Sequence, residues 1–228
     1  MKTTEDEWLY FLKSKPHWTV PTEDIIILSP HPDDETLGAG GLIYNLRKHN
    51  QSVKIIAITD GENAYPKMNT LRAIRQKEQE DALSLLGLSA ENIIRLRLED
   101  SGLSKQKARL KNLLEPYFTP NNHIIAPWIN DYHADHEITG QVAQRLAQDN
   151  KTSLSFYFFW TWHHATIKDL KPYTLKLYCL EQRTQERKLQ ALACYDSQYY
   201  YDQGNAILST EQLAPAYRPF EVFYTDEH

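Results

Sequence analysis

The chain has 228 residues, of which 41% are hydrophobic, and these values suit one well-buried α/β domain rather than a disordered or fibrous chain. A formal net charge of −5 without long basic runs excludes a phosphate-tracking surface, so no nucleic-acid partner is expected. No apolar run approaches the roughly twenty residues of a transmembrane helix, and two cysteines are too few for a disulfide framework, so we expect a soluble, cytoplasmic protein.

Up to Trp160 the chain alternates between short β-rich runs and helical patterns, which is typical of βαβ units and a parallel sheet. Asp24–Ser29 is a continuous apolar run, as expected for a strand buried on both faces. Further strands are predicted at Val53–Thr59, Ile93–Leu98, Asn122–Pro127 and Leu154–Trp160. Helices are predicted between them at Thr36–His49, Asn69–Leu86, Lys105–Leu114 and Glu137–Asp149.

Beyond Trp160 the pattern loosens. A strand at Thr174–Leu180, a helix at Thr184–Tyr195 and a short strand at Val222–Tyr224 are predicted, without an order in the sheet. No repeat or Pro/Gly/Ser-rich linker marks a boundary, so residues 1–228 are predicted to form a single domain. Its core spans about residues 24–160, and residues 161–228 form a less regular C-terminal extension of the same domain. The fold class is α/β, with a mostly parallel sheet flanked by helices.

The first chemically informative segment directly follows the first predicted strand. Residues 29–35 read Ser-Pro-His-Pro-Asp-Asp-Glu, with one imidazole and three carboxylates within five positions. Neighbouring carboxylates repel one another unless a cation or a hydrogen-bonding shell offsets their charge. A capped helix start would need only one of these acids and would not explain His31. A bound cation is therefore the more economical interpretation.

The second segment, residues 131–136, follows the strand predicted to end at Pro127 and reads Asp-Tyr-His-Ala-Asp-His. Ligands bind open α/β sheets at the carboxyl ends of the strands, so the two segments can meet there. A catalytic zinc site needs three protein ligands and an open position. His31, Asp34 and His136 would supply the ligands, although such a mixed site accepts other divalent ions.

The remaining acids and imidazole of the two segments suit proton transfer. Asp33 is adjacent to a predicted ligand but should point elsewhere, so it can accept a proton from a metal-activated water. His133, in its protonated form, could stabilise the oxyanion or donate to the departing nitrogen. Asp135 is predicted to fix the tautomer and orientation of His133.

These residues resemble the motifs of the PIG-L/LmbE-like family of zinc-dependent N-deacetylases. The HPDDE motif of the family stands here at His31–Glu35, and its HxDH motif stands at His133–His136. Weaker marks of the family are Thr59–Glu62, Arg75 with Glu78, Asp100 near Gly102, Ser197-Gln198 and Glu221 with Phe223. Two features depart from the pattern: Tyr195 stands where many members have histidine, and the aromatic-rich segment Leu154–His164 matches no mark of the family.

The resemblance implies a Rossmann-like fold and a zinc ion on His31, Asp34 and His136. It also implies that Asp33 is the base and that His133 stabilises the oxyanion. Substrates of the family are N-acetylglucosaminyl compounds, so the expected partner is a small molecule or glycoconjugate that carries an N-acyl amino sugar.

For several residues the sequence leaves two roles open. Glu35 could support the site or contact the metal, and Asp131 could close its loop or act near the metal. Arg75 and Asp100 are candidate substrate contacts, although Arg75 could equally form an exposed ion pair with Glu78. His164, with its neighbour at 163, is expected at the surface or at the edge of the substrate.

The function predicted is zinc-dependent hydrolysis of an N-acyl group, with N-acetyl favoured, from an amino-sugar substrate. One alternative is a metal-dependent amidase or esterase that acts on a non-sugar substrate. Another is a catalytically inactive protein that binds a metal or a sugar, although binding alone requires neither Asp33 nor His133. A dinucleotide-dependent enzyme is disfavoured because no GxGxxG motif follows the first strand.

Overall fold

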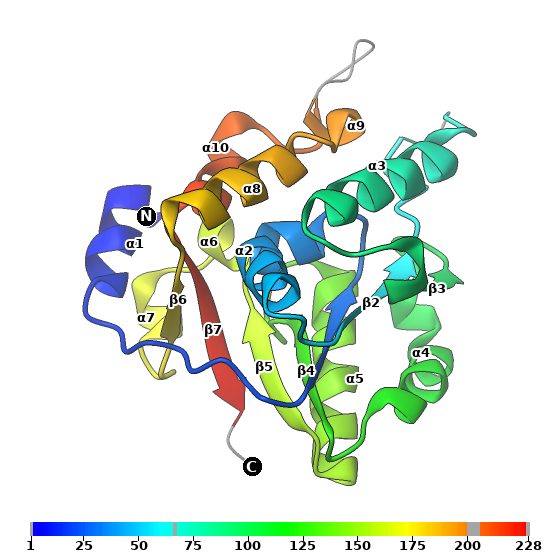
Figure 1. Cartoon of the computed structure of the whole chain (residues 1–228), viewed down its shortest axis with the longest axis horizontal. Helices are drawn as coiled ribbons and strands as arrows, with labels where there is room; N and C mark the ends of the chain where they lie inside the picture. The colour runs from blue at the N-terminus through cyan, green and yellow to red at the C-terminus, as the bar shows by residue number, and fades with distance from the viewer. Residues whose placement is uncertain (1, 66–67, 200–205, 227–228) are drawn as a thin grey trace.

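The computed structural model describes residues 2–65, 68–199 and 206–226. Seven strands form one sheet in the order β3-β2-β1-β4-β5-β7-β6, with helices on both faces (Figure 1). Strands β1 to β5 are parallel, and β7 is antiparallel to both of its neighbours. The strands are β1 Asp24–Ser29, β2 Val53–Thr59, β3 Ile93–Leu98, β4 Asn122–Pro127, β5 Ser153–Tyr157, β6 Lys176–Cys179 and β7 Phe220–Asp226.

Strand β1 is covered on both faces, as its continuous apolar run predicts. Ile25 and Ile27 pack with the helices of one face, whereas Ile26 and Leu28 pack with those of the other. Helices α2, α3 and α8 cover the first face, and α1, α4 and α5 cover the second. These helices are α1 Glu5–Leu12, α2 Asp34–Lys48, α3 Leu71–Leu85, α4 Lys107–Leu114, α5 Ala134–Asn150 and α8 Gln182–Leu192.

Besides shifts of a few residues at the ends of other elements, the structure differs from the predictions in three places. Helix α1 was not predicted, although Thr4 and Glu7 form a capping box that begins it. Strand β5 ends at Tyr157, so the aromatic residues up to Trp160 leave the sheet and form a loop. Helix α8 ends at Leu192, which leaves Tyr195 in the turn before the short helix α9 Asp196–Tyr199.

The C-terminal region is irregular, as its weak pattern predicts. It contains the short helices α6 Thr161–His164, α7 Ile167–Leu170 and α10 Thr210–Leu213 together with β6, β7 and α8. Glu221 at the start of β7 accepts the backbone N–H groups of Gly41 and Leu42, just after a break in α2 at Ala39. Lys188 of α8 binds the same carboxylate at 2.8 Å. The C-terminal region thus stabilises the kinked helix that leads out of the first motif.

The strand order reverses at β1, which lies between β2 and β4. The two chemically informative segments follow β1 and β4, so they meet at this switch point of the sheet. No helix among the described residues is long and apolar enough to cross a membrane.

Candidate metal and catalytic site

The loop after β1 separates two neighbouring aspartates. Asp34 begins α2, and its Oδ2 accepts the backbone N–H of His31 at 2.9 Å. Asp33 has φ 129°, a left-handed value that strains a non-glycine residue by on the order of 1–3 kcal/mol. Its carboxylate lies instead against Arg75, with 3.4 Å between Oδ2 and Nη2. The strained turn therefore gives the two carboxylates different surroundings.

Oδ2 of Asp34 lies between imidazoles from the two loops. It is 3.2 Å from Nδ1 of His31 and 3.2 Å from Nε2 of His136. Around a tetrahedral zinc ion with bonds of about 2.0–2.2 Å, neighbouring ligand atoms are about 3.3–3.6 Å apart. Nε2 of His136 is buried and makes no hydrogen bond to a described residue. The three side chains thus have the donor types and spacing of a three-ligand metal site.

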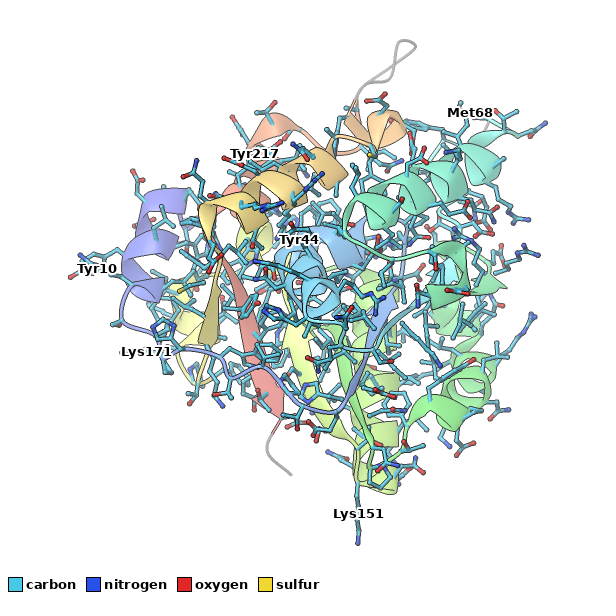
Figure 2. All side chains as sticks on the ribbon, viewed as in Figure 1. Tyr10, Tyr44, Met68, Lys151, Lys171 and Tyr217 are labelled. Carbon is cyan, nitrogen blue, oxygen red and sulfur yellow. The ribbon has the colours of Figure 1, made fainter. Side chains whose placement is uncertain are left out.

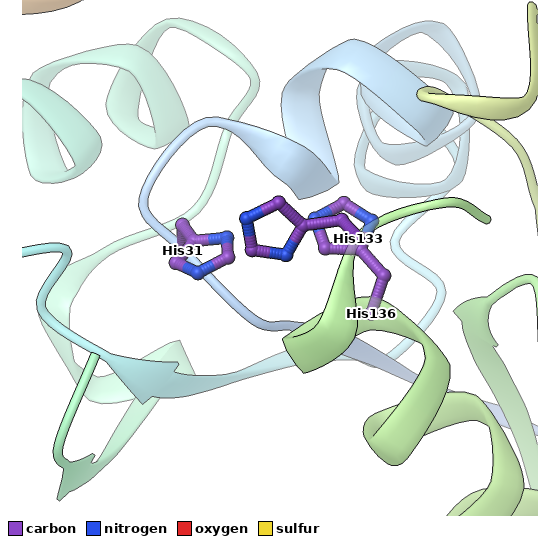
Figure 3. A group of neighbouring side chains, drawn as sticks. All are labelled: His31, His133 and His136. Carbon is purple, nitrogen blue, oxygen red and sulfur yellow. The ribbon is translucent and has the colours of Figure 1, made fainter. Parts of the chain in front are cut away.

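His133 brings a third imidazole to the same place (Figure 3). Its ring centre is 4.9 Å from that of His31 and 5.0 Å from that of His136. Ligand atoms of these three histidines lie within 4.8 Å of one another, and so do those of a second group, His31, Asp100 and Asp135. Asp34 faces Nδ1 of His31, whereas Asp100 and Asp135 face Nε2. Nδ1 can therefore bind a cation while Nε2 is held by a carboxylate.

Asp135 lies against His31 rather than against His133, the partner predicted from the sequence. Its Oδ2 lies 3.5 Å from Nε2 of His31, and its carboxylate accepts the backbone N–H groups of Ser101 and Leu103. Among the described residues, no hydrogen bond joins it to His133, whose Nδ1 is buried without a partner. Asp135 therefore orients His31, because the first turn of α5 directs its side chain away from the histidine two positions earlier.

Asp131 performs both of the roles that the sequence left open. Its Oδ2 is 2.8 Å from Nδ1 of His136, so it orients that imidazole. The same carboxylate accepts the backbone N–H groups of Phe159, Trp160 and Thr161, and the Thr161 hydroxyl. One buried carboxylate thus joins a candidate metal ligand to the loop that follows β5.

Arg75 is hydrogen-bonded to the loop after β1. It is 4% exposed, and its guanidinium donates to the carbonyl oxygens of Pro32 and Gly61. The exposed ion pair with Glu78 is therefore wrong, because Glu78 accepts the backbone N–H and the hydroxyl of Ser197 instead. Arg75 still lines the cavity described below.

The candidate base and the third imidazole have opposite pKa shifts. Burial raises the pKa of Asp33 to about 8, and the charge of Asp34 adds to this rise while that of Arg75 opposes it. Burial lowers the pKa of His133 to about 4, and positive charge on His31 and His136 adds to this effect. Burial therefore favours the uncharged form of His133.

Glu35 is a buried support of the site. Its carboxylate accepts hydrogen bonds from Ser29, Thr36, Gln79 and Tyr195. The Tyr195 hydroxyl donates at 2.7 Å, so the tyrosine that departs from the family pattern still reaches the first motif. With these partners within the protein, Glu35 has a structural role next to the two aspartates.

A cavity of about 180 Å³ opens over these residues. Its polar lining comes from both motifs and from Arg75, Asp100, Ser101 and Gln198. Its apolar lining consists of Leu37, Ala64, Phe159, Trp160, Ile207 and Leu208. Leu37, Ala64, Ile207 and Leu208 were missed as site residues, and nothing local in the sequence marks Ile207 or Leu208.

Two comparisons by sequence match this chain to known proteins. The model of the PIG-L family, described as GlcNAc-PI de-N-acetylase, matches residues 26–147, which include both motifs. A Bacillus anthracis protein described as a probable N-acetyl-alpha-D-glucosaminyl L-malate deacetylase 2 is 27% identical over 198 residues, covering 77% of this chain and 81% of that protein.

Two solved structures share the fold. The N,N'-diacetylchitobiose deacetylase from Pyrococcus horikoshii has a TM-score of 0.61 at 22% identity, covering 89% of this chain and 82% of that one. The zinc-inhibited form of teicoplanin deacetylase Orf2 has a TM-score of 0.67 at 14% identity, covering 89% and 97%. With the family model matching more than half of its length, this chain belongs to the PIG-L family.

Proposed function

We propose that this protein is a metal-dependent N-deacetylase that acts on an N-acetylated amino sugar. The observation that carries the proposal is the shared position of Asp34 Oδ2, 3.2 Å from one imidazole nitrogen of His31 and 3.2 Å from one of His136. Family membership and the deacetylases among the relatives support the reaction type. The polar lining of the cavity suits a sugar.

His31, Asp34 and His136 would hold the metal, and the donor set fits Zn²⁺. A bound divalent cation would polarise the acyl carbonyl and lower the pKa of water. The carboxylate of Asp131 lies 2.8 Å from Nδ1 of His136, and that of Asp100 lies 3.3 Å from Nε2 of His31. Such partners fix the tautomer and direction of metal-ligating histidines.

Asp33 would accept the proton from the attacking water. Burial raises the pKa of Asp33, which makes its carboxylate a stronger base. Neutral His133 lines the cavity and would donate a hydrogen bond to the acyl oxygen as charge develops there. Asp100, Ser101 and Gln198 line the cavity and would bind sugar hydroxyls.

The test measures release of free amine by zinc-loaded protein from methyl N-acetylglucosaminide, methyl N-acetylgalactosaminide and N-acetyl amino acids, and release of acetate from acetate esters. The proposal expects amine from at least one sugar and none after the metal is removed by a chelator. Turnover confined to amino acids or esters would overturn the sugar assignment and favour the non-sugar hydrolase. Metal binding without any turnover would favour a binding protein.

A further inference from the structure

Four aromatic rings form a row that leads from the cavity to the surface. His133 and Trp160 line the cavity, with ring centres 6.0 Å apart and planes inclined by 19°. Trp160 is 6.1 Å from His164 at 31°, and His164 is 5.7 Å from Tyr132 at 35°. Rings in full face contact lie about 3.5–4 Å apart, so these rings are offset from one another.

The outer end of this ring row is open to solvent. Tyr132 is 50% exposed and His164 is exposed, whereas His133 and Trp160 are partly buried. Tyr132 is one of five large hydrophobic side chains recorded as exposed in the described part of the chain. Tyr132 therefore presents an aromatic side chain to solvent at the outer end of the row that begins in the cavity.

The ring row is fixed to the catalytic scaffold. Tyr132 directly follows Asp131 and has φ 60°, a left-handed value that strains a side chain of this size. Asp131 also accepts the backbone N–H groups of Trp160 and Thr161, and Thr161 begins the helix that carries His164. The same carboxylate that orients His136 therefore sets the positions of the outer rings.

We propose that His164 and Tyr132 form a second sugar subsite, which binds a pyranose ring joined to the N-acyl sugar in the cavity. The inference rests on the proposed function and specifies its substrate class as an N-acyl glycoside of at least two rings. A pyranose presents apolar C–H faces that pack on uncovered aromatic faces, and its hydroxyls need polar neighbours. Glu137, whose Oε1 accepts the Tyr132 backbone N–H at 3.2 Å, and Asp169 in a neighbouring groove supply acceptors.

The experiment compares kcat/KM for N,N'-diacetylchitobiose with kcat/KM for methyl N-acetylglucosaminide. For wild type we expect a preference for the two-ring substrate. Tyr132→Ala and His164→Ala should each lower this preference about three- to tenfold, the range of one aromatic contact, through KM for the two-ring substrate. Tyr132→Phe keeps the ring and should keep the preference.

Tyr10→Ala is the matched control, because Tyr10 is 84% exposed and projects from α1 at the edge of the molecule (Figure 2). A preference that is equal in wild type and in both ring variants would overturn the subsite. So would an equal preference for p-nitrophenyl N-acetylglucosaminide, because the row would then bind any flat aglycone.

A binding measurement separates this inference from the proposed function. N,N'-diacetylchitobiose titrated into Asp33→Asn, read by tryptophan fluorescence, should bind more weakly once Tyr132→Ala is added. Loss of affinity without amine release by wild type would keep the subsite and reject the deacetylase. Amine release with unchanged affinity would keep the deacetylase and reject the subsite.

Discussion

The two walls of the cavity are built in different ways. Most of the polar wall comes from loops at the ends of β1, β3 and β4, and its side chains contact one another: His31 contacts Asp34, Asp100 and Asp135. Most of the apolar wall comes from the kinked helix α2, the loop after β5 and the C-terminal region, and it packs in a small separate core that includes Leu37 and Leu208. We infer that the parallel half of the sheet sets the reaction, whereas the C-terminal region sets which substrate fits.

The largest effect should come from the base on the polar wall. Asp33→Asn keeps the size of the side chain but removes its ability to accept a proton, so kcat should fall at least about a hundredfold. Metal content should stay at the wild-type value, because Asp33 lies against Arg75 rather than beside the ligand nitrogens. Amine release and elemental analysis on the same preparation measure both quantities. Turnover at the wild-type rate would move the base to another residue.

The second prediction concerns the residue that joins the two walls. Asp131→Asn replaces one acceptor oxygen with an NH₂ group, so Asp131 can no longer accept from both His136 and the loop after β5. Zinc affinity of the metal-free protein should fall about 10- to 100-fold. KM should rise as well, since Phe159 and Trp160 lose their anchor.

Thr161→Val is the control for Asp131, because it removes only the hydroxyl hydrogen bond to Oδ1. This variant should retain zinc affinity near the wild-type value. Equal losses of zinc affinity in the two variants would show that the loop, rather than the bond from Asp131 to His136, controls metal binding.

The third prediction compares the two ends of β4. His136, beyond the carboxyl end, is buried, but Asp34 and Asp131 raise its pKa to about 9. His123, near the amino end, is bonded to the Ser155 hydroxyl, and burial lowers its pKa to about 4 despite the charge of Glu23. Two carboxylates in contact with His136 thus outweigh its burial, whereas the charge of Glu23 does not outweigh the burial of His123.

Because the pKa of His123 is lower in the folded state, the unfolded state binds the proton first as the pH falls. The folded state is therefore fully stable with respect to His123 above pH 6.5, and it loses stability as the pH falls from 6.5 toward 4. Between pH 8 and pH 5.5, wild type should lose between about 1 and 2 kcal/mol more unfolding free energy than His123→Gln. Urea unfolding at both pH values measures this difference. Identical pH dependences would show that His123 does not carry it.

The smallest effect should come from the apolar wall. Leu208→Ala removes part of the apolar lining and none of the proton-transfer groups, so KM should rise only a few-fold while kcat and metal content stay near wild type. A fall in kcat larger than the rise in KM would contradict the division of roles between the two walls.

The sequence predicted the parallel sheet because its buried strands are continuous apolar runs such as Asp24–Ser29. It also brought His31, Asp34 and His136 together, because the carboxyl ends of neighbouring parallel strands share one edge. The partner of Asp135 was predicted wrongly, since side-chain directions in the first turn of a helix depend on backbone geometry that spacing does not give. Ile207 and Leu208 reach the cavity through long-range packing, which leaves no local pattern.

The metal content of purified protein after equal exposure to zinc and dialysis tests the central claim most directly. The account predicts about one zinc per chain in wild type and in Thr161→Val. It predicts loss of the metal in His31→Ala, Asp34→Ala and His136→Ala, each checked for folding by its thermal unfolding. Full zinc occupancy in a folded His136→Ala protein would contradict the proposed ligand set.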